Sequence, residues 1–525
     1  MHEFIARHKD QIVGTLSGFD RLVFRGTLRS ISYVDGMQAY LNSNGVLLKD
    51  FETHVKAVSD RIQKASLAAA RETGRPIRYL ASSQTSKEQI ARQIAAEDHI
   101  GEGLIAVLTC VEPCRSFEIY RNRDEKKRQL QVRDRKCLFL YHYWFDPCLG
   151  FMNARIQTWF PFPIQVCLNG REWLARQMDA CGIKYLAADN CFPWIEQWDR
   201  AQELMDRQLR SDWPMLLNRI AAQLNPIHES VFASYPLRYY WSTYQHEWAI
   251  DVVFRESDYL RRLYPRLIEQ GITTFGSTDV LRYLGKRVPL TGQVPKTFRG
   301  ELVSTLKERQ EGIRIKHVVN GNSVKLYDKA FTQLGAVLRG EATFQNTRDL
   351  RVYRPKEGEP DGPRSWRPMR RGIADLHRRA ELSQKATGRY LDAYAAIDDS
   401  TTLEQLLAKS QKATTWHGRR VRALRLFNED RPLTAAIARG EFTVTGFRNR
   451  DLQHLLFSSP PRTHQEARRR SAWITRQLRL LRAHGLITKI AGTHRYQLTD
   501  SGRKITSAVL TALHATVQQL MPTAA

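Results

Sequence analysis

The alternation of hydrophobic and polar residues is most regular near the C-terminus of the chain. Within residues 466–484, Ile474, Leu478 and Leu481 recur every three or four positions, which is the spacing of the apolar stripe of a helix. Gly485 follows at the position where helices favour glycine. The residues expected on the opposite face are mostly basic: Arg468, Arg469, Ala472, Thr475, Arg476 and Arg479. The pattern predicts a helix with one buried and one cationic face.

A short hairpin and a second helix are predicted after this helix. Residues 486–490 are typical of a strand, residues 491–495 of a tight turn, and residues 496–499 of the returning strand. Thr499 or Asp500 can cap a final helix. The apolar positions of that helix are Val509, Leu513 and Val517.

The first 230 residues predict a mixed α/β domain. Strands are expected at 22–28, 77–80, 104–111, 138–145 and 151–168. Helices are expected at 49–73, 86–96, 171–180 and 193–224. The apolar run at 104–111 is typical of a strand buried on both faces, and the aromatic segments 138–145 and 151–168 are expected to be antiparallel strands.

Residues 231–370 predict a second, β-rich domain. Its strands are expected at 301–309, 313–319, 323–327 and 337–344. Asn320-Gly321-Asn322 is a strong hairpin signal, because Asn and Gly accept the positive φ that such turns need. The Pro- and Gly-rich stretch 355–368 predicts a linker at the end of this domain.

A helical segment, 371–430, with its main helix at 373–397, and a C-terminal domain, 431–525, complete the predicted organisation. The expected class is therefore α+β and multidomain. A chain of 525 residues is too long for one hydrophobic core, which agrees with this division into four parts, 1–230, 231–370, 371–430 and 431–525.

The C-terminal order of helix, strand, turn, strand and helix resembles the winged helix-turn-helix domains of MarR-type bacterial regulators. The resemblance is carried by LLRAHGLI at 480–487 and TDSGR at 499–503. In that family the long helix enters the major groove of DNA and the hairpin, or wing, touches the flanking backbone. The resemblance implies DNA-binding roles for Arg468, Arg469, Thr475, Arg476 and Arg479 on the helix, and for His494 and Arg495 on the wing.

The remainder of the chain adds a broader resemblance without an activity. IKH at 315–317, NSVKLYDK at 322–329 and GFRNRDL at 446–452 resemble a bacterial family of large proteins that are often labelled only as MarR-type regulators. Typical MarR proteins are much shorter, and most of this chain has no counterpart in them. This departure argues against simple repression and for a second activity or binding surface in the N-terminal part.

The charge balance favours a polyanionic partner. Lys and Arg number 81 against 54 Asp and Glu, which gives a formal net charge of +27 and a pI near 10.0. Phosphate backbones attract such a chain, while the 42% hydrophobic fraction excludes a mostly disordered basic protein. We therefore expect a nucleic-acid-binding protein, acting as a transcriptional regulator or a mobile-element protein. DNA is the expected partner, structured RNA is an open alternative, and a homodimer is the usual state of winged-helix regulators.

A second class of function, an enzyme, is suggested by residues 313–344. This segment resembles the strands of rolling-circle replication initiators through its YDK and R-x-E sequences. In that class a tyrosine attacks a DNA phosphodiester and acidic groups hold a divalent metal. The resemblance implies that Tyr327 is the catalytic nucleophile and that Glu341, with Asp328, holds the metal. Otherwise no cofactor is expected.

Basic residues near this tyrosine fit the same hypothesis. Lys325 and Lys329 alternate with Tyr327, so the three share one strand face. A tyrosine with a pKa of ~10 needs a nearby cation or metal to act near neutrality. The resemblance implies phosphate binding by Lys329 and Arg339. The alternative is that Tyr327 stacks on a base of a nucleic acid that is not cut.

Two further patterns have structural interpretations. The segment around Glu247 and Asp251 would place both carboxylates on one helix face, as a catalytic pair or as salt-bridged surface.

The seven cysteines, an odd number, predict free thiols in a reducing cytoplasm, and buried structural cysteines are favoured over a zinc site. No apolar run of ~18 residues and no signal peptide is found, which predicts a cytoplasmic protein.

Overall fold

The computed structural model consists of two compact units. It describes residues 2–121, 127–286, 300–309, 312–332, 335–348, 350–356, 358–359, 361–395, 402–439, 442, 446–490 and 493–515. The sheet unit comprises Met1–Pro265 and Val303–Asp392, and the C-terminal unit comprises Arg266–Leu302 and Ala393–Ala525. Both helices and a large sheet are present, so the predicted α+β multidomain class is confirmed at this level.

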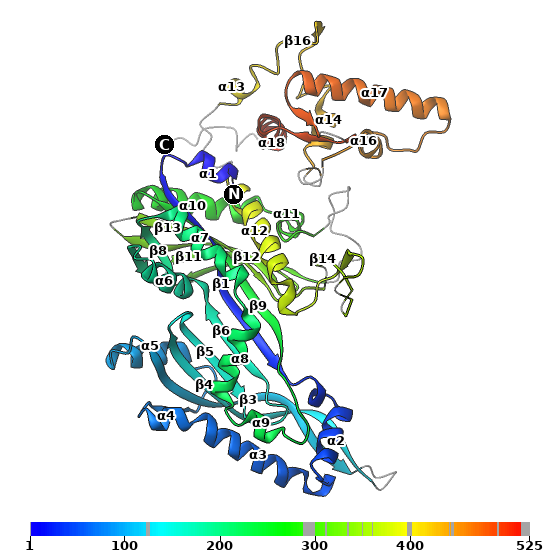
Figure 1. Cartoon of the computed structure of the whole chain (residues 1–525). Helices are drawn as coiled ribbons and strands as arrows, with labels where there is room; N and C mark the ends of the chain where they lie inside the picture. The colour runs from blue at the N-terminus through cyan, green and yellow to red at the C-terminus, as the bar shows by residue number, and fades with distance from the viewer. Residues whose placement is uncertain are drawn as a thin grey trace. The chain divides into compact units, whose positions relative to one another are not determined.

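The sheet unit is built on one sheet of eleven strands (Figure 1). Its order is β10 (Leu302–Arg309), β11 (Gly312–Val319), β12 (Asn322–Thr332), β13 (Gly335–Phe344), β9 (Tyr240–Phe254), β1 (Ile12–Thr27), β6 (Ile164–Asn169), β5 (Gly150–Gln157), β4 (Arg128–Asp146), β3 (Gly103–Arg121) and β2 (Ile77–Leu80). β2 and β3 are parallel, and the pairs from β3 to β11 are antiparallel. The boundary predicted at residue 230 is wrong, because β9 pairs directly with β1 in this sheet and β13 pairs with β9.

Helices pack against this sheet. They are α1 (His2–Arg7), α2 (Val34–Ser43), α3 (Phe51–Ser66), α4 (Ala68–Glu72), α5 (Lys87–Glu97), α6 (Gly170–Ala180), α7 (Trp198–Asp206), α8 (Trp213–Leu224), α9 (His228–Val231), α10 (Ser257–Thr273) and α12 (Leu376–Asp392). α12 packs on β9 and β13, where Nε2 of His246 lies 2.8 Å from the hydroxyl of Ser383. α6, α7 and the hairpin of β7 (Tyr185–Ala188) and β8 (Cys191–Ile195) pack against β1, β12 and β13.

The segment with Glu247 and Asp251 is a strand, and the helix expected there is wrong. β9 is rich in aromatic and β-branched residues and pairs over most of its length with both β1 and β13. This pairing overrides the helical spacing of the two carboxylates. Residues four apart also share a face of a strand, so Glu247 and Asp251 still point the same way.

Two other expected elements are divided in the structure. The strand predicted at 151–168 is two strands, β5 and β6, because Pro161 and Pro163 cannot donate ladder hydrogen bonds between them. The linker predicted at 355–368 is partly a hairpin, in which β15 (Ser365–Pro368) pairs with β14 (Arg351–Arg354). Both strands belong to the sheet unit, so this stretch does not mark the domain boundary that was predicted.

The C-terminal unit contains helices and two-stranded hairpins, which include the predicted long helix, hairpin and final helix and several elements that the sequence did not predict. They are α11 (Ser277–Tyr283), α13 (Leu403–Leu407), β16 (Thr414–Trp416), β17 (Arg419–Val421), α14 (Arg431–Ile437), α16 (Asn449–Leu456), α17 (His464–Ala483), β18 (Ile487–Lys489), β19 (Tyr496–Leu498) and α18 (Asp500–His514). Thr499, one of the two caps that the sequence allowed, caps α18 through a hydrogen bond from the Gly502 amide. Val517 and residues 491–492 lie outside the described residues. The helical segment predicted at 371–430 is not one domain, since α12 belongs to the sheet unit.

A single apolar core holds α14, α16, α17, α18 and the hairpin together. Ile474, Leu478 and Leu481, the predicted stripe of α17, are at most 2% exposed in this core. They pack with Leu452 of α16 and Val509 of α18. Burial of this stripe leaves the opposite face of α17 at the surface. In the described part of the chain, no helix combines the length and apolar character needed to cross a membrane.

Candidate functional site

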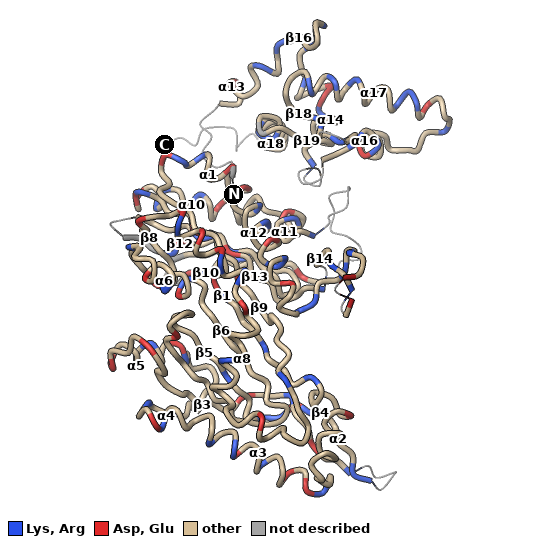
Figure 2. The backbone as a smooth tube through the Cα atoms, in the orientation of Figure 1, with Lys and Arg blue, Asp and Glu red and all other residues tan. Residues whose placement is uncertain are grey.

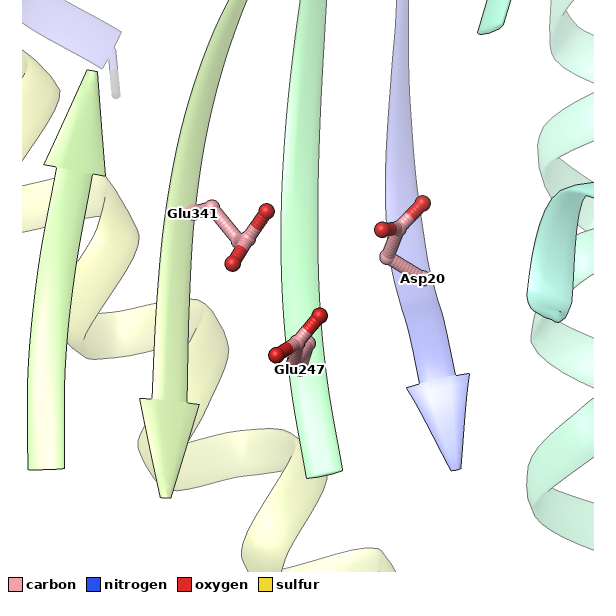
Figure 3. Close-up of side chains that lie close together, drawn as sticks. All are labelled: Asp20, Glu247 and Glu341. Atoms are coloured by element: carbon pink, nitrogen blue, oxygen red, sulfur yellow. The ribbon is translucent and has the colours of Figure 1, made fainter. Parts of the chain in front are cut away.

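Three carboxylates converge on one face of the sheet. Asp20 of β1, Glu247 of β9 and Glu341 of β13 come from three adjacent strands, and each offers an oxygen within 4.8 Å of the others (Figure 3). We call them the carboxylate triad. In the described part of the chain no other group of three or more His, Cys, Asp or Glu side chains is close enough to share a metal ion. The seven cysteines are free.

Strand register explains the convergence. Glu341 pairs with Ala249, and Glu247 lies two residues from Ala249, so both side chains project from the same face. On β1 the register shifts between Phe19 and Arg21, which leaves Asp20 as an extra residue. Such a β-bulge changes the direction of a side chain. The bulge therefore allows Asp20 to join the two glutamates.

Glu341 and Tyr327, the two residues predicted as catalytic, are in direct contact. The hydroxyl of Tyr327 donates a hydrogen bond to Oε2 of Glu341 over 2.5 Å. Lys325 forms an ion pair with the other oxygen of Glu341, and its Nζ lies 3.9 Å from Glu247. Lys325 and Tyr327 reach Glu341 because they lie opposite Glu341 and Arg339 in the β12–β13 ladder. The sequence thus identified Tyr327 and Glu341, which are neighbours, but it did not identify the two carboxylates beside Glu341.

Asp328, the other predicted metal ligand, is not part of the triad. It follows Tyr327 directly on β12, and successive side chains of a strand point to opposite faces. Burial raises its pKa to about 6. The assignment of Asp328 to the metal site is therefore wrong.

Arg339 connects the triad to a second set of buried charges. Its side chain is 0% exposed and lies 2.9 Å from Asp20, and it forms two hydrogen bonds to Asp251. Arg171 of α6 forms a further ion pair with Asp251 over 2.9 Å. Because the guanidinium of Arg339 is fully occupied, the predicted phosphate-binding role of Arg339 is wrong. Lys329 is likewise paired, with Asp189.

The electrostatics of the triad reflect crowding of negative charge. Burial, followed by the negative charge of Glu341, raises the pKa of Glu247. The pKa of Asp20 is also raised by burial, against the lowering effect of Arg339. Burial alone would raise the pKa of Glu341, but Lys325 and the hydrogen bonds outweigh it and lower that pKa. A divalent cation would relieve the crowding that Asp20 and Glu247 experience.

The chemistry of these ligands fits a hard cation. Carboxylate oxygens are the ligands that Mg²⁺ and Mn²⁺ prefer. Asp20 and Glu247 also line a pocket of about 180 Å³, which Arg21, Arg92 and Asn153 help to form. Two of the three carboxylates of the triad are thus accessible from a cavity, whereas Glu341 is buried behind them and is not among the lining residues.

The basic face of α17 is the second candidate site. Arg468, Arg469, Arg476 and Arg479 are exposed, and none of them forms an ion pair with a carboxylate within the described ranges. Figure 2 shows the basic positions distributed along this helix. Arg470 differs from these four, because it is paired with Glu466 one turn earlier.

The other predicted DNA-binding residues are only partly available. Thr475 is exposed, but its hydroxyl is bonded to Ser471 and to the Asn449 side chain of α16. His494 is exposed on the hairpin connection. Arg495 is half-buried and donates to the carbonyl oxygen of Gly446. The exposed cations of this site therefore belong mainly to the helix.

Comparison with known proteins adds no assignment. No family model matches the sequence, and no curated protein and no solved structure matches it either.

Sequence reasoning did not identify Asp20 or Glu247 as members of one site. A signal exists in GFDRLVF, because an aspartate inside an otherwise apolar strand is rarely buried unless it is paired. The wide separation of Asp20 from Glu341 along the chain conceals the partner.

Proposed function

We propose that this protein binds duplex DNA through α17 and the β18–β19 hairpin, as a winged helix-turn-helix domain does. The observation that carries the proposal is the set of four exposed arginines on one helix, Arg468, Arg469, Arg476 and Arg479, which have no carboxylate partner among the described residues. A face with this charge repels itself in isolation and is neutralised by a polyanion.

The dimensions of α17 suit the major groove. Its 20 residues give a length of ~30 Å, and the major groove is ~12 Å wide, enough to admit an α-helix. The apolar side of α17 is fixed by the core, so the arginine side faces outward. Arginine also forms bidentate hydrogen bonds with guanine and with phosphate.

The hairpin is held beside the segment that precedes α16. Phe447 and Tyr496 form an isolated β-bridge, and Arg495 bonds Gly446 in the same region. Lys489 and His494 are exposed on this hairpin and its connection. They supply the backbone contacts expected of a wing.

Duplex DNA is preferred over structured RNA on geometric grounds. The major groove of A-form RNA is deep and too narrow for side chains to read, whereas that of B-DNA admits a helix. Competition between DNA and RNA duplexes of the same sequence tests this choice. Stronger binding of the RNA duplex would assign α17 to RNA instead.

The test of the proposal is a substitution on the exposed face. Binding of labelled duplex DNA, selected from random sequences, is measured by fluorescence anisotropy for the full chain and for the double variant Arg476→Ala, Arg479→Ala. Removal of an arginine that reads a base is expected to weaken discrimination by ~1–3 kcal/mol. The control is Arg425→Ala in the same unit, where the arginine is exposed but paired with Glu429. Equal affinity and sequence preference in the double variant and the control would overturn the proposal.

A second candidate function is divalent-metal-dependent cleavage of DNA. The convergence of Asp20, Glu247 and Glu341 beside a pocket favours it. A cation held there would stabilise negative charge on a phosphodiester. Burial, followed by the charge of Glu341, raises the pKa of Tyr327 well above its usual value. The tyrosine is therefore a poor nucleophile and serves to orient Glu341.

Incubation with supercoiled and single-stranded DNA and Mn²⁺ tests this candidate. Nicking that is abolished in Glu341→Gln and retained in Tyr327→Phe supports metal-dependent cleavage without a tyrosyl intermediate. Loss of nicking in Tyr327→Phe with retained metal binding would restore the tyrosine mechanism. No nicking under any of these conditions leaves DNA binding as the function.

A further inference from the structure

The sheet unit contains a pocket of about 360 Å³ whose charged walls are all basic. It lies among the ends of β1 and β9, the middle of β3 and residues 370–372. The arginines that line it are Arg25, Arg29, Arg115, Arg370 and Arg371. No Asp or Glu is among its lining residues. We call it the arginine pocket; none of its lining residues belongs to the carboxylate triad or to the pocket beside it.

Aromatic rings hold two of these arginines in place. The guanidinium carbon of Arg29 lies 3.8 Å from the ring centre of Tyr240, and that of Arg371 lies 5.5 Å from the ring centre of Tyr244. The amide of Thr243 donates to the carbonyl oxygen of Arg371 over 2.6 Å, which fixes the segment 370–372 to β9. Arg29 and Arg371 are therefore positioned by contacts that leave their charges uncompensated.

No carboxylate neutralises Arg25, Arg29, Arg115 or Arg371 in the part of the chain that the structure describes. Their mutual repulsion is visible at Arg25. Burial first, and then the positive charges of Arg155 and Arg371, lower its pKa, against the opposing effect of Tyr244. Like charges gathered around a cavity without counter-charges are stabilised when an anion enters.

The remaining walls of the pocket suit a flat ring. Val132, Pro161 and Pro163, which are half-buried, contribute apolar surface, and Tyr33, which is 65% exposed, lies among the lining residues. Inorganic phosphate would fill a small part of the volume and would leave this surface unused. A volume of a few hundred Å³ with apolar walls and a few convergent polar groups is typical of sites for small organic ligands.

We propose that the arginine pocket binds a nucleoside phosphate, with its phosphate among Arg25, Arg115 and Arg371 and its base against Tyr33. The unit that binds is either a free nucleotide or the terminal nucleotide of a nucleic-acid strand, which share this chemistry. Guanidinium groups form strong charge-assisted bonds with phosphate oxygens, and aromatic side chains stack on bases.

The proposal does not depend on DNA binding by α17, because every residue of the pocket belongs to the sheet unit. The double variant Arg476→Ala, Arg479→Ala keeps the pocket intact. It is expected to bind nucleoside phosphates as the wild-type chain does. Failure of either proposal can therefore be recognised without the other.

Isothermal titration calorimetry of the full chain tests the proposal with four probes. They are inorganic phosphate, adenosine 5′-monophosphate, and a short oligothymidylate with or without a 5′-phosphate. The nucleotide is expected to bind at least about 10-fold more tightly than inorganic phosphate. A further gain for the 5′-phosphorylated oligonucleotide that disappears without that phosphate assigns the pocket to strand ends, and no gain assigns it to free nucleotides.

Substitutions locate the site. Arg25→Met and Arg371→Met are each expected to weaken nucleotide binding by about 10-fold or more, while Tyr33→Ala weakens binding of the nucleotide but not of inorganic phosphate. Arg200→Met is the control, since Arg200 is on α7 and pairs with Glu203. If circular dichroism shows that Arg25→Met does not fold, the nucleotide affinity of Arg371→Met, a variant of the exposed segment, tests the proposal. Unchanged nucleotide affinity in Arg371→Met, or no binding of any nucleotide probe at millimolar concentration, would overturn the proposal.

Discussion

Tyr327 donates its hydroxyl hydrogen to Oε2 of Glu341 over 2.5 Å, from β12 to the adjacent strand β13. The donor keeps its proton in this arrangement, because burial and the charge of Glu341 both raise the pKa of the phenol. The tyrosine thereby fixes one oxygen of Glu341 while Lys325 engages the other. The residues that the sequence suggests as a nucleophile and a metal ligand are thus also a hydrogen-bond donor and its acceptor.

Glu341 is expected to matter more for cation binding than Tyr327. Glu341→Gln removes one of three converging carboxylates, whereas Tyr327→Phe removes only a hydrogen bond to it. Mn²⁺ titration monitored by electron paramagnetic resonance should show binding in the wild type and in Tyr327→Phe, and strongly weakened binding in Glu341→Gln. Glu229→Gln, at an exposed position, serves as the control. Equal Mn²⁺ affinity in Glu341→Gln and the control would exclude the triad as a metal site.

Arg339→Met is expected to destabilise the sheet unit by ~3–5 kcal/mol. The substitution leaves Asp20 and Asp251 buried without their shared cation, as both are at most 5% exposed. Urea unfolding of the full chain measures the loss. Arg200→Ala, which breaks the exposed pair with Glu203, should change stability by no more than ~0.5 kcal/mol. A similar effect of the two substitutions would show that the buried network contributes little.

Gly170→Ala is expected to lower the free energy of unfolding by ~1–3 kcal/mol, because the added Cβ would clash with the backbone of β1. A Cβ at Gly170 would lie 1.7 Å from the carbonyl oxygen of Phe19, so α6 would have to move away from β1. Arg171, the next residue, would then move from its position against Asp251. Gly101→Ala, where a Cβ meets open space, is the matched control. Thermal unfolding that is equal for the two variants would contradict the close approach of α6 to β1.

Stability should fall as the pH drops from about 6.5 to about 4. His142 is 2% exposed, and burial lowers its pKa to about 4. Over this range the unfolded chain binds a proton that the folded chain does not, so folding loses up to ~3 kcal/mol from this group. Below pH 4 both states are protonated and the loss stops growing. His246 and His317, whose pKa values burial also lowers, add to the same trend.

The variant His142→Phe measures how much of the pH-dependent loss of folding stability is due to His142. Its stability is expected to decline less steeply between pH 6.5 and 4 than that of the wild type, as measured by urea unfolding at fixed pH. His464→Phe, on the exposed N-terminal turn of α17, is the control. A parallel pH profile for His142→Phe and wild type would contradict a buried neutral His142.

Local signals predicted α17, the β18–β19 hairpin and α18. The stripe of Ile474, Leu478 and Leu481 placed α17 within two residues of its observed ends, and Thr499 was one of the two residues expected to cap α18. The turn at Asn320-Gly321 was also predicted, and both residues have positive φ, 49° and 82°. These features depend on neighbours in the sequence, which periodicity and turn chemistry describe.

Long-range pairing was not predictable in the same way. Asp20, Glu247 and Glu341 meet only because β1, β9 and β13 are adjacent in one sheet, and a bulge at Asp20 sets its direction. Glu247 was assigned to a helix because its spacing from Asp251 fits either periodicity. A single sequence contains no signal for the order of strands that lie far apart along the chain.

Affinity for duplex DNA as a function of salt concentration tests the central proposal most directly. Neutralisation of about four phosphates by the exposed arginines of α17 predicts that log Kobs falls with log salt with a slope of about −4, and that Arg476→Ala, Arg479→Ala reduces the slope by about 1–2. A binding curve that does not respond to salt, or a slope that the double variant leaves unchanged, would contradict the assignment of α17 to the DNA interface.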